Sequence, residues 1–404
     1  MRDIDLLQLA LGLVPPWMVA AADFDAEQKR LDIEIDFKTG GRFPCPECDK
    51  ASCPVHDTVR KTWRHLDFFQ HQAFLHARVA RIDCPNCGVR LVNVPWARPG
   101  SGFTLLFEAF AMTLVTAMPV AAAARLVGEH DTRLWRVVQH YVETAVARMD
   151  LADLRRVAID ETAAKRGHNY ITLFVDIDAR KVVYVAEGRG ADTVARFADH
   201  VDDHNWDASR IKQVCIDMSA AYIKGVTDNL TEAEITFDKF HAVKLVNDAV
   251  DKVRRAESKG RPELKRSRYL WLRNEPSLSA ESRAQLAALT RLHLKTARAY
   301  RIRLAFQEVY NQPTWKWGEL FLDRWYKWAI RSRLDPIKEA ARTIKKHRDG
   351  ILAWFDSRIA NGLIESINSL VQAAKAKARG YRSLRNLVAI TYLIAGKIDI
   401  RLPT

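Results

Sequence analysis

Three acidic residues in three separate settings constrain most strongly what this chain can fold into. Asp160 ends the apolar run Val-Ala-Ile, Asp217 ends the run Val-Cys-Ile, and Glu365 follows Asn-Gly-Leu-Ile in a segment that favours helix. Two carboxylates on strands and a third on a distant helix can converge on two divalent metal ions. Such a pair of ions activates a water or a 3′-hydroxyl and stabilises the leaving oxygen during attack on a phosphodiester. The three acids are therefore candidate ligands of a phosphoryl-transfer site.

The order of elements after residue 155 supports this grouping. The chain predicts three strands, then a helix, a strand, a helix and a last strand; the strands lie at 156–162, 170–178, 181–188, 211–217 and 235–238. This is the order of the ribonuclease H fold. It places Asp160 on the first strand and Asp217 on the fourth, which follows a helix as in a parallel crossover.

Each acid also has an ordinary structural role open to it. Asp160 can be a strand-end residue satisfied by backbone donors, and Asp217 can cap the helix that follows it. Glu161, Asp176 and Asp178 compete for the same site, although a regular strand turns Glu161 to the opposite face from Asp160. The fold order, more than either aspartate alone, favours Asp160 and Asp217.

Five of the six cysteines lie between residues 45 and 87, and four of these, Cys45, Cys48, Cys84 and Cys87, form two Cys-x-x-Cys turns. Each turn aims two thiolates at one ion, so two turns complete a tetrahedral zinc site. The 35 residues between the turns fit a zinc ribbon with a long hairpin, whose second strand is expected at 72–82. Cys53 and His56 leave two alternatives open, a second ion or an exchanged ligand, but we expect them to be loop residues.

Residues 103–146 predict three helices in a helix-turn-helix arrangement, with Pro119 starting the second helix and Gly128 ending it. The third helix turns four apolar residues inward, Leu134, Val137, Val138 and Tyr141. It presents Thr132, Arg133, Arg136 and Gln139 outward, where a recognition helix contacts DNA bases. An ordinary three-helix bundle is the alternative.

The charge of the chain indicates a polyanionic partner. The formal net charge is +14 and the pI about 9.5, and neutralising phosphates releases counterions. Residues 242–350 are expected to be helical and rich in Lys and Arg, an insertion before the last catalytic helix. Its aromatic residues between 315 and 328 are expected in the core, with stacking on unpaired DNA bases as the alternative. Beyond Glu365, we expect DNA-backbone contacts from Lys375, Lys377, Arg379 and Arg382.

The chain shows neither a signal peptide nor a membrane span. Its first residues carry acids, and the most apolar stretch, 105–127, is interrupted by Glu108, Pro119 and Arg125. We therefore expect no membrane partner and a cytoplasmic, nucleoid-associated protein. Clustered cysteines in such a chain indicate metal rather than disulfides.

These observations predict a multidomain α+β protein with a zinc ribbon, a helix-turn-helix, and a ribonuclease-H-like α/β catalytic domain interrupted by an all-α insertion. The expected segments are 1–98 for the N-terminal segment and ribbon, 99–150 for the helix-turn-helix, 151–241 for the first catalytic part, 242–350 for the insertion, and 351–404 for the last catalytic helix and tail.

Nearly the whole chain resembles bacterial insertion-sequence transposases of the ISL-three family, which are of the DDE type. Beside the cysteines, the motifs that carry the resemblance are Arg64-His-Leu-Asp67, Val94-Pro-Trp-Ala-Arg98, Ala158-Ile-Asp-Glu-Thr162, Ile216-Asp-Met218, Phe237-Asp-Lys-Phe-His241, Asn361-Gly-Leu-Ile-Glu365 and Gly380-Tyr-Arg382. The resemblance implies that the catalytic triad is Asp160, Asp217 and Glu365. It also implies a site near the active centre at Asp238 and His241, for which packing is the alternative.

The implied activity is cleavage at the terminal inverted repeats of an insertion sequence and joining of the 3′-hydroxyl to target DNA. It would use two Mg²⁺ or Mn²⁺ ions per active site and one structural zinc, in a homodimer or larger assembly on double-stranded DNA. Two rivals remain: a ribonuclease-H-like nuclease or resolvase without strand transfer, and a transposase-derived DNA-binding regulator without catalysis.

Overall fold

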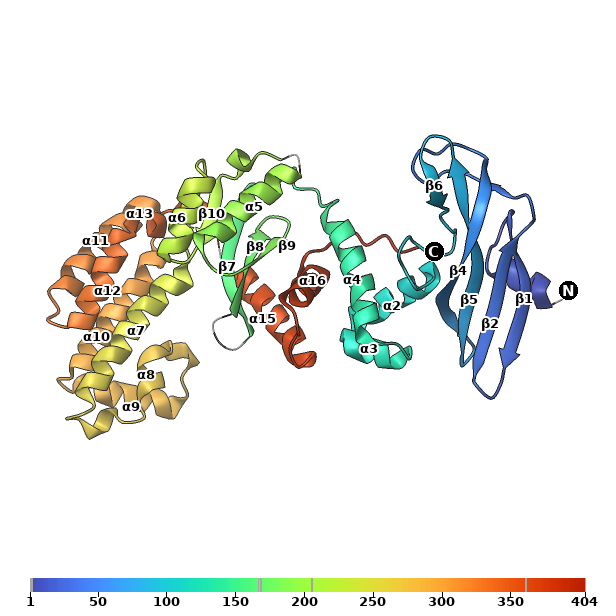
Figure 1. Cartoon of the computed structure of the whole chain (residues 1–404). Helices are drawn as coiled ribbons and strands as arrows, with labels where there is room; N and C mark the ends of the chain where they lie inside the picture. The colour runs from blue at the N-terminus through green and yellow to red at the C-terminus, as the bar shows by residue number, and fades with distance from the viewer. Residues whose placement is uncertain (1–2, 166, 168, 205, 360–361, 404) are drawn as a thin grey trace. The chain divides into compact units, whose positions relative to one another are not determined.

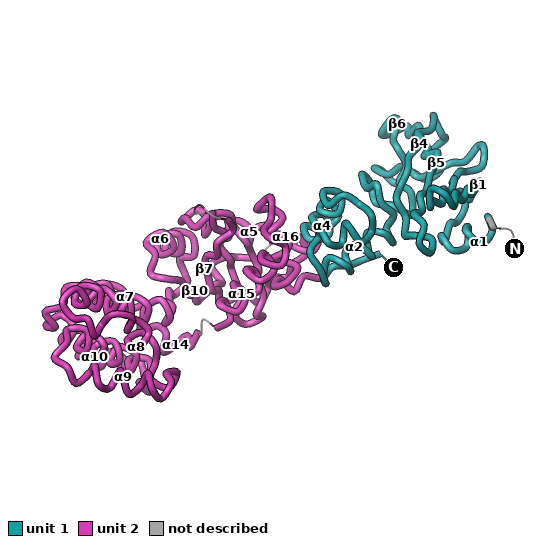
Figure 2. The backbone as a smooth tube through the Cα atoms, turned by 90° about the horizontal axis from the view of Figure 1, so that it is seen from below, with its two compact units in different colours: residues 1–143, 400–404 teal, residues 144–399 magenta. Residues whose placement is uncertain are grey.

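The computed structural model describes residues 3–165, 167, 169–204, 206–359 and 362–403 (Figure 1). Two compact units are distinguished by their internal contacts (Figure 2). Unit 1 comprises Met1–Glu143 and Ile400–Thr404, and unit 2 comprises Thr144–Asp399. Within the described residues, helices that combine the length and the apolar character needed to cross a bilayer are absent.

Unit 1 is built on a sheet whose centre is a long antiparallel hairpin of β4 and β5, with strand order β1-β2-β5-β4-β3 and β6 paired to β5. This hairpin separates the two cysteine turns, as the spacing predicts. Sequence analysis missed that β2 pairs in parallel with β5 and extends the sheet. The elements are α1 (Asp3–Ala10), β1 (Trp17–Asp25), β2 (Arg30–Phe37), β3 (Arg42–Phe43), β4 (Cys53–Phe68), β5 (His71–Cys84) and β6 (Gly88–Leu91).

The helices of unit 1 form the predicted helix-turn-helix: α2 (Leu105–Ala117), α3 (Val120–Leu126) and α4 (Asp131–Val146). Gly128 has φ of +69°, the left-handed conformation that ends a helix without strain in glycine. The four residues expected to point inward are all buried: Leu134, Val137, Val138 and Tyr141.

Arg64 joins the ribbon to the helices. Its backbone N–H donates to the Gly102 carbonyl and its own carbonyl accepts from the Thr104 N–H, both at 3.0 Å. The side chain is 1% exposed, binds Asp67, and lies 3.8 Å from Glu129 between α3 and α4. Since one buried side chain contacts the hairpin and the helix turn, the ribbon and the helices of unit 1 pack as one body.

Unit 2 contains a five-stranded sheet of order β11-β10-β7-β8-β9. The first three strands are antiparallel neighbours, and β10 and β11 are added in parallel. This confirms the predicted element order. Helix α5 begins at Ala191 after Gly190, and Asp192 in its first turn pairs with Arg196. The elements are β7 (Arg156–Lys165), β8 (Asn169–Asp176), β9 (Lys181–Glu187), α5 (Ala191–Asp203), β10 (Gln213–Ile216), α6 (Ala220–Asn229) and β11 (Glu234–Phe237).

Residues 239–357, which follow β11 directly, consist of helices and the turns between them, as expected. The α-helices are α7 (Lys239–Glu257), α8 (Arg268–Leu272), α9 (Ala280–Arg291), α10 (Lys295–Gln307), α11 (Trp315–Ile330), α12 (Asp335–Lys346), α13 (Arg348–Leu352) and α14 (Trp354–Ser357). Trp325 is 2% exposed, but Trp317 and Trp328 lie on the surface. The prediction that these aromatic residues form core is therefore wrong for part of the set.

Two helices complete unit 2, α15 (Gly362–Lys377) and α16 (Leu384–Ala395). Gly380, with φ of +93°, lies between them and ends the first, as the sequence predicts. Helix α15 contacts β7 and α16 contacts β9. The predicted start near Asn361 lies outside the described residues.

Candidate active site and metal centre

The sheet of unit 2 brings three aspartates to one edge. In the parallel pair of β10 and β7, Cys215 is opposite Ala158, so two further residues along both strands Asp217 falls beside Asp160. The same extension from Ile216 opposite Phe237 places Asp238 beside Asp217. The carboxyl ends of parallel strands share an edge, and this edge therefore carries an acidic cluster made of Asp160, Asp217 and Asp238.

The electrostatics show that these groups influence one another. Burial is the main cause that raises the pKa of Asp160 to about 6; the charge of His241 opposes the rise, and the charges of Glu161 and Asp238 contribute to it. His241 Nδ1 lies 2.5 Å from Asp238 Oδ2; that hydrogen bond raises the pKa of His241, and the charges of Asp160 and Asp217 add to the effect. A carboxylate that is costly to ionise beside other carboxylates is stabilised by a cation.

The competing acids have other roles. Asp176 Oδ1 accepts from the backbone N–H groups of Asp178 and Ala179 in a turn, and Asp178 pairs with Arg156. Glu161 is opposite Thr172, whose hydroxyl meets Tyr222 of α6 at 3.0 Å. Glu161 therefore faces α6.

Asp160 faces the other side of the sheet, where it meets α15. Its Oδ2 accepts from Asn368 Nδ2 at 2.8 Å, while its Oδ1 accepts from the backbone N–H of Glu161 at 2.9 Å. The predicted alternation between Asp160 and Glu161 is thus confirmed. Asp217 also keeps its ordinary role, since its Oδ1 accepts from the Ser219 N–H at 2.8 Å at the start of α6.

Three side chains hold α15 against β7 in one register. The first is Asn368, which donates to Asp160. One turn later along the helix, Gln372 Nε2 donates to Thr162 Oγ1 at 2.7 Å and to the Ala163 carbonyl at 3.0 Å. Lys375 Nζ donates to the same carbonyl at 2.5 Å. The spacing of 4 and 3 residues puts these side chains on one helix face. We call Asn368, Gln372 and Lys375 the α15 register contacts.

Glu365 lies three residues before Asn368, so it occupies the next turn of the same helix face. Its side chain is exposed in the first turn of α15. The register contacts therefore bring Glu365 to the side of the sheet on which Asp160 points. Sequence analysis missed Asn368 and Gln372, although the helical spacing Glu-x-x-Asn-x-x-x-Gln-x-x-Lys was present in the chain.

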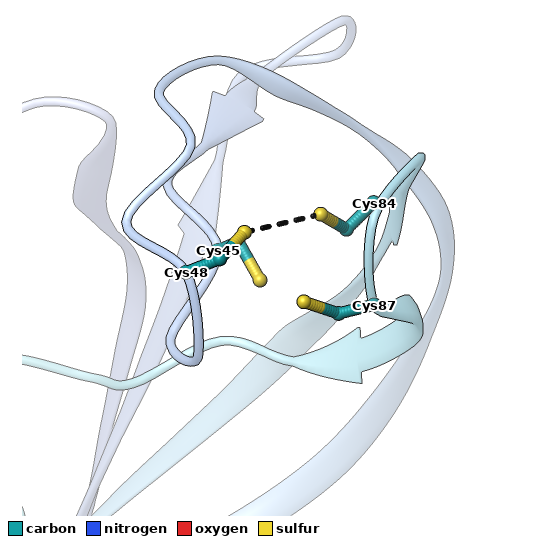
Figure 3. A group of neighbouring side chains, drawn as sticks. All are labelled: Cys45, Cys48, Cys84 and Cys87. Atoms are coloured by element: carbon teal, nitrogen blue, oxygen red, sulfur yellow. Dashed lines mark hydrogen bonds between the residues drawn. The ribbon is translucent and has the colours of Figure 1, made fainter.

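The four predicted cysteines form a compact sulfur cluster (Figure 3). The sulfur atoms of Cys45, Cys48, Cys84 and Cys87 all lie within 4.8 Å of one another, and Cys48 Sγ is 3.6 Å from Cys84 Sγ. Tetrahedral zinc with Zn–S bonds of about 2.3 Å needs sulfur pairs about 3.8 Å apart. The cluster fits zinc in both ligand type and spacing.

Cys53 and His56 do not belong to this cluster, and neither lies in a loop as expected. Both are on β4. Cys53 is buried, and its thiol donates to the Lys50 carbonyl at 3.6 Å; burial raises its pKa and the neighbouring Cys84 adds to the effect. His56 is exposed and lies 3.4 Å from Asp57.

Among the described residues, the cysteine cluster is the one group of three or more candidate ligands that is this compact. Asp160, Asp217 and Glu365 are spaced more widely, so at least one pair of their oxygen atoms is more than 4.8 Å apart. Two bridged cations about 3.5–4 Å apart need ligands spread over such a distance. Carboxylate oxygens are also the ligand type that Mg²⁺ prefers.

The predicted DNA-contact residues differ in their exposure and in the contacts that they already make. Thr132 and Arg136 are exposed on α4, and Gln139 is half-buried. Arg133 binds Glu129, donates to the Gly102 carbonyl at 3.3 Å and lies 4.2 Å over the Phe103 ring, so part of its side chain serves the packing of unit 1.

In the basic segment after Glu365, Lys375 is one of the register contacts, whereas Lys377, Arg379 and Arg382 are exposed. The carbonyl of Arg382 accepts a hydrogen bond from Lys165 Nζ at 2.5 Å, which ties this segment to the end of β7. Three cationic side chains are thus displayed near the hairpin that follows Asp160.

Comparison with known proteins gives three consecutive family matches. Residues 41–87 match the model described as the zinc-finger of transposase IS204/IS1001/IS1096/IS1165. Residues 92–142 match the helix-turn-helix domain of transposase family ISL3, and residues 157–391 match the DDE model of the same family, described as a transposase.

Curated relatives agree with these matches over most of the chain. The transposase for insertion sequence element IS1557 of Mycobacterium tuberculosis is 30% identical over 431 aligned residues, which cover 97% of this chain and 96% of the relative. The transposase for insertion sequence element IS1001 of Bordetella parapertussis is 28% identical over 349 residues, 84% of this chain and 85% of the relative.

Proposed function

Because the chain belongs to the ISL3 family of insertion-sequence transposases, we propose that it binds the terminal inverted repeats of its own element, cleaves DNA there and joins the freed 3′-hydroxyl to target DNA. The observation that carries the proposal is the hydrogen bond between Asn368 and Asp160. It links the helix of Glu365 to the sheet edge where Asp160 and Asp217 lie side by side.

In this proposal Asp160, Asp217 and Glu365 hold two Mg²⁺ or Mn²⁺ ions. When bound, such ions activate the attacking hydroxyl and stabilise the leaving oxygen. Asn368 orients the Asp160 carboxylate by donating to its Oδ2, while Oδ1 accepts from the Glu161 backbone N–H; each oxygen keeps a second lone pair with which it could bind a metal ion. Asp238 and His241 form a hydrogen-bonded pair beside Asp217 and act as positioning residues for the cluster.

Unit 1 is proposed to select the DNA ends. Thr132, Arg136 and Gln139 on α4 would contact bases, with Arg133 supporting the start of the helix. The zinc ribbon packs on these helices through Arg64, so its surface would extend the contact along the duplex. Lys377, Arg379 and Arg382 would hold the DNA backbone near the active site, with Lys375 bound to β7.

Two ends must be cut and joined together, so the working complex is proposed to contain at least two chains related by two-fold symmetry. The proposed segments are 1–98, 99–150, 151–241, 242–350 and 351–404. The helical insertion, 242–350, is proposed as the bridge between chains, because it separates Asp217 from Glu365 and adds surface that the sheet does not need. We propose that the protein works on DNA in the cytoplasm.

The test uses duplexes that carry the flanking inverted repeat, purified full-length protein and Mg²⁺. Alanine at Asp160, Asp217 or Glu365 is expected to abolish both cleavage and strand transfer while end binding stays within about twofold, since the DNA-positioning contacts lie elsewhere. Glu161→Gln is the matched control, because it changes the neighbouring acid on the opposite face.

The outcomes separate the rivals. Cleavage without joined product in the unchanged protein indicates a nuclease or resolvase, and binding without cleavage indicates a regulator. Near-normal cleavage by one alanine variant removes that residue from the site.

A further inference from the structure

Helix α11 exposes a second apolar face that the core does not use. Trp317 is 57% exposed, Leu320 45% and Trp328 43%. With Arg324, these residues follow one another at steps of 3, 4 and 4 and so share one helix face. The opposite face, with Leu322, Trp325 and Ala329, is at most 2% exposed. Two large indole rings on the surface of one helix are unusual for an unpartnered protein face.

Cations run through the same face. Arg324 and, two turns later, Arg331 extend the row of Trp317, Leu320 and Trp328, and within the described part of the chain the structure gives neither arginine an ion pair. The acidic residues of α11, Glu319 and Asp323, are not in this row. Both bind Arg348, at 2.7 Å and 3.3 Å respectively. We call Trp317, Leu320, Arg324, Trp328 and Arg331 the α11 face.

This face is held rigidly on the body that carries the catalytic helix. Trp325 Nε1 donates to the Ile302 carbonyl at 2.9 Å. Gly318 packs so closely on α14 that an added Cβ would lie 2.3 Å from the Phe355 ring. Helix α14 precedes α15 in the chain, and nine residues separate Phe355 from Glu365. Figure 2 colours these helices as parts of unit 2.

We propose that the α11 face is a binding site for unpaired DNA strands, with bases stacked on Trp317 and Trp328 and phosphates held by Arg324 and Arg331. Aromatic rings combined with cations are the recurrent means of binding single strands without sequence preference. In a duplex the bases are already stacked on each other, so the flat faces of the indoles find partners in unpaired bases. The site is separate from the acidic cluster and does not depend on the proposed chemistry there.

A second copy of the chain is the less favourable occupant. Closed dimers usually pair a surface with the same surface of the partner. Such a pairing would bring the arginines of two α11 faces together, and like charges taken out of water without a counterion are destabilising. A polyanionic strand instead supplies the missing counter-charges.

The test measures binding of a fluorescein-labelled 20-nucleotide oligothymidine to the full-length, zinc-containing protein by anisotropy. Trp317→Ala combined with Trp328→Ala is expected to weaken binding by about tenfold or more, since one base–aromatic stack contributes roughly 1–3 kcal/mol. Phenylalanine at both positions should restore most of the affinity, because the ring is kept. An abasic strand of the same length should bind the unchanged protein as weakly as the double alanine variant binds oligothymidine.

Trp315→Ala is the matched control, since Trp315 is on the same helix and 39% exposed but lies two residues, about 200°, from Trp317. Its affinity should be unchanged, and thermal unfolding should be the same for all variants. Unchanged oligothymidine binding by the double variant overturns the proposal, as does an equal loss for duplex and single strand. Loss of self-association in sedimentation, with strand binding intact, would identify a second copy as the occupant. Glu365→Ala should retain strand binding, so failure of the proposed catalysis is distinguishable.

Discussion

At the scale of single residues, Asn368 connects the two halves of the candidate active site. It donates to Asp160 Oδ2, and its own Oδ1 is buried without a hydrogen-bond partner in the described structure. An amide oriented by one bond in this way can fix the direction of a carboxylate without neutralising it. If Asp160 binds a metal ion as proposed, metal binding would depend on a residue that is not itself an acid.

Asn368→Ala is therefore expected to lower end cleavage about 10–100-fold and to raise the Mg²⁺ concentration needed for half-maximal rate. The physical reason is the loss of the donor that orients Asp160. Cleavage rates across a Mg²⁺ titration measure it, with end binding as the reference. Ser369→Ala, at the exposed neighbouring position, is the control. An unaltered Mg²⁺ dependence in Asn368→Ala would show that the hydrogen bond has no such role.

The cysteine cluster leads to a prediction about metal content. The protein is expected to contain one zinc per chain, and serine at Cys45, Cys48, Cys84 or Cys87 should unfold the ribbon, because metal binding and folding are coupled in small zinc modules. Cys53→Ser should keep one zinc per chain, since Cys53 donates to a carbonyl instead. Elemental analysis of the purified proteins decides between these outcomes, and a count of two or none contradicts the prediction.

His65 provides a pH dependence of stability. Burial, with a smaller contribution from Arg64, lowers the pKa of His65 to about 4, so the folded chain holds this ring neutral against Thr104 at 2.9 Å. In the unfolded chain the pKa is about 6.5. As the pH falls below 6.5, His65 binds a proton in the unfolded chain but stays neutral in the folded chain until about pH 4. The free energy of unfolding therefore decreases between pH 6.5 and about pH 4.

Between pH 7 and pH 5 the His65 contribution is a loss of at most about 2 kcal/mol. Urea unfolding of the unchanged protein and of His65→Gln, at both pH values, isolates it, because the other titrating groups are common to both. Glutamine keeps a polar partner for Thr104 and does not titrate. Equal pH dependence of the two proteins would mean that His65 titrates alike in the folded and unfolded states.

At the scale of elements, Arg64 makes the ribbon and the helices of unit 1 interdependent. Arg64→Ala is expected to destabilise unit 1 by about 1–3 kcal/mol, because it leaves the buried Ala73 carbonyl without this donor and leaves Glu129 with Arg133 alone. Lysine should not restore stability, since it lacks the planar fork of donors. Arg60→Ala, on the exposed side of the same strand, should change stability little.

Thermal unfolding followed by tryptophan fluorescence and by zinc release tests the coupling. Both signals should shift together to lower temperature in Arg64→Ala. A ribbon that keeps its zinc while the helices melt would show that the two parts are independent.

Elements with a strong local pattern were predictable, and those defined by distant pairing were not. The strands around Asp160 and Asp217, the helical insertion and the two cysteine turns follow from periodicity and spacing. The parallel pairing of β2 with β5 was not predictable. Arg30 pairs with Gln72, which is distant in the sequence, and neither segment has a residue pattern that indicates the other. Residue type predicted burial for Trp317, but a helix with two apolar faces can bury only one.

The site was predictable only in part for a similar reason. Acidic residues after apolar runs pointed to Asp160 and Asp217, and the resemblance supported Glu365. Asn368 and Gln372 are polar residues on a helix, a pattern shared with any solvated face, and only the packing of α15 on β7 distinguishes them.

At the scale of the whole molecule, the proposed pairing of two chains on DNA predicts the result of mixing two inactive variants. A chain with Glu365→Ala is mixed with a chain that cannot bind ends because Thr132 and Arg136 are alanine. If each active site acts on the end bound by its partner, the mixture should cleave one end, whereas each variant alone cleaves none. Gel analysis of a duplex with two differently labelled ends measures this. Complete cleavage and joining by a single chain on a single end would refute the pairing.

The position of the helical insertion also delays the synthesis of Glu365 relative to that of Asp217. Asp217 and Glu365 are 148 residues apart in the chain, with α7 to α14 between them. At translation rates of about 5–20 residues per second, a ribosome needs roughly 7–30 s to pass from one to the other. A nascent chain thus contains helices α2 to α4, which are proposed to bind the DNA ends, well before Glu365 is synthesised. Polypeptides released early would occupy the ends without cutting them, and so would act as dominant inhibitors of the finished protein.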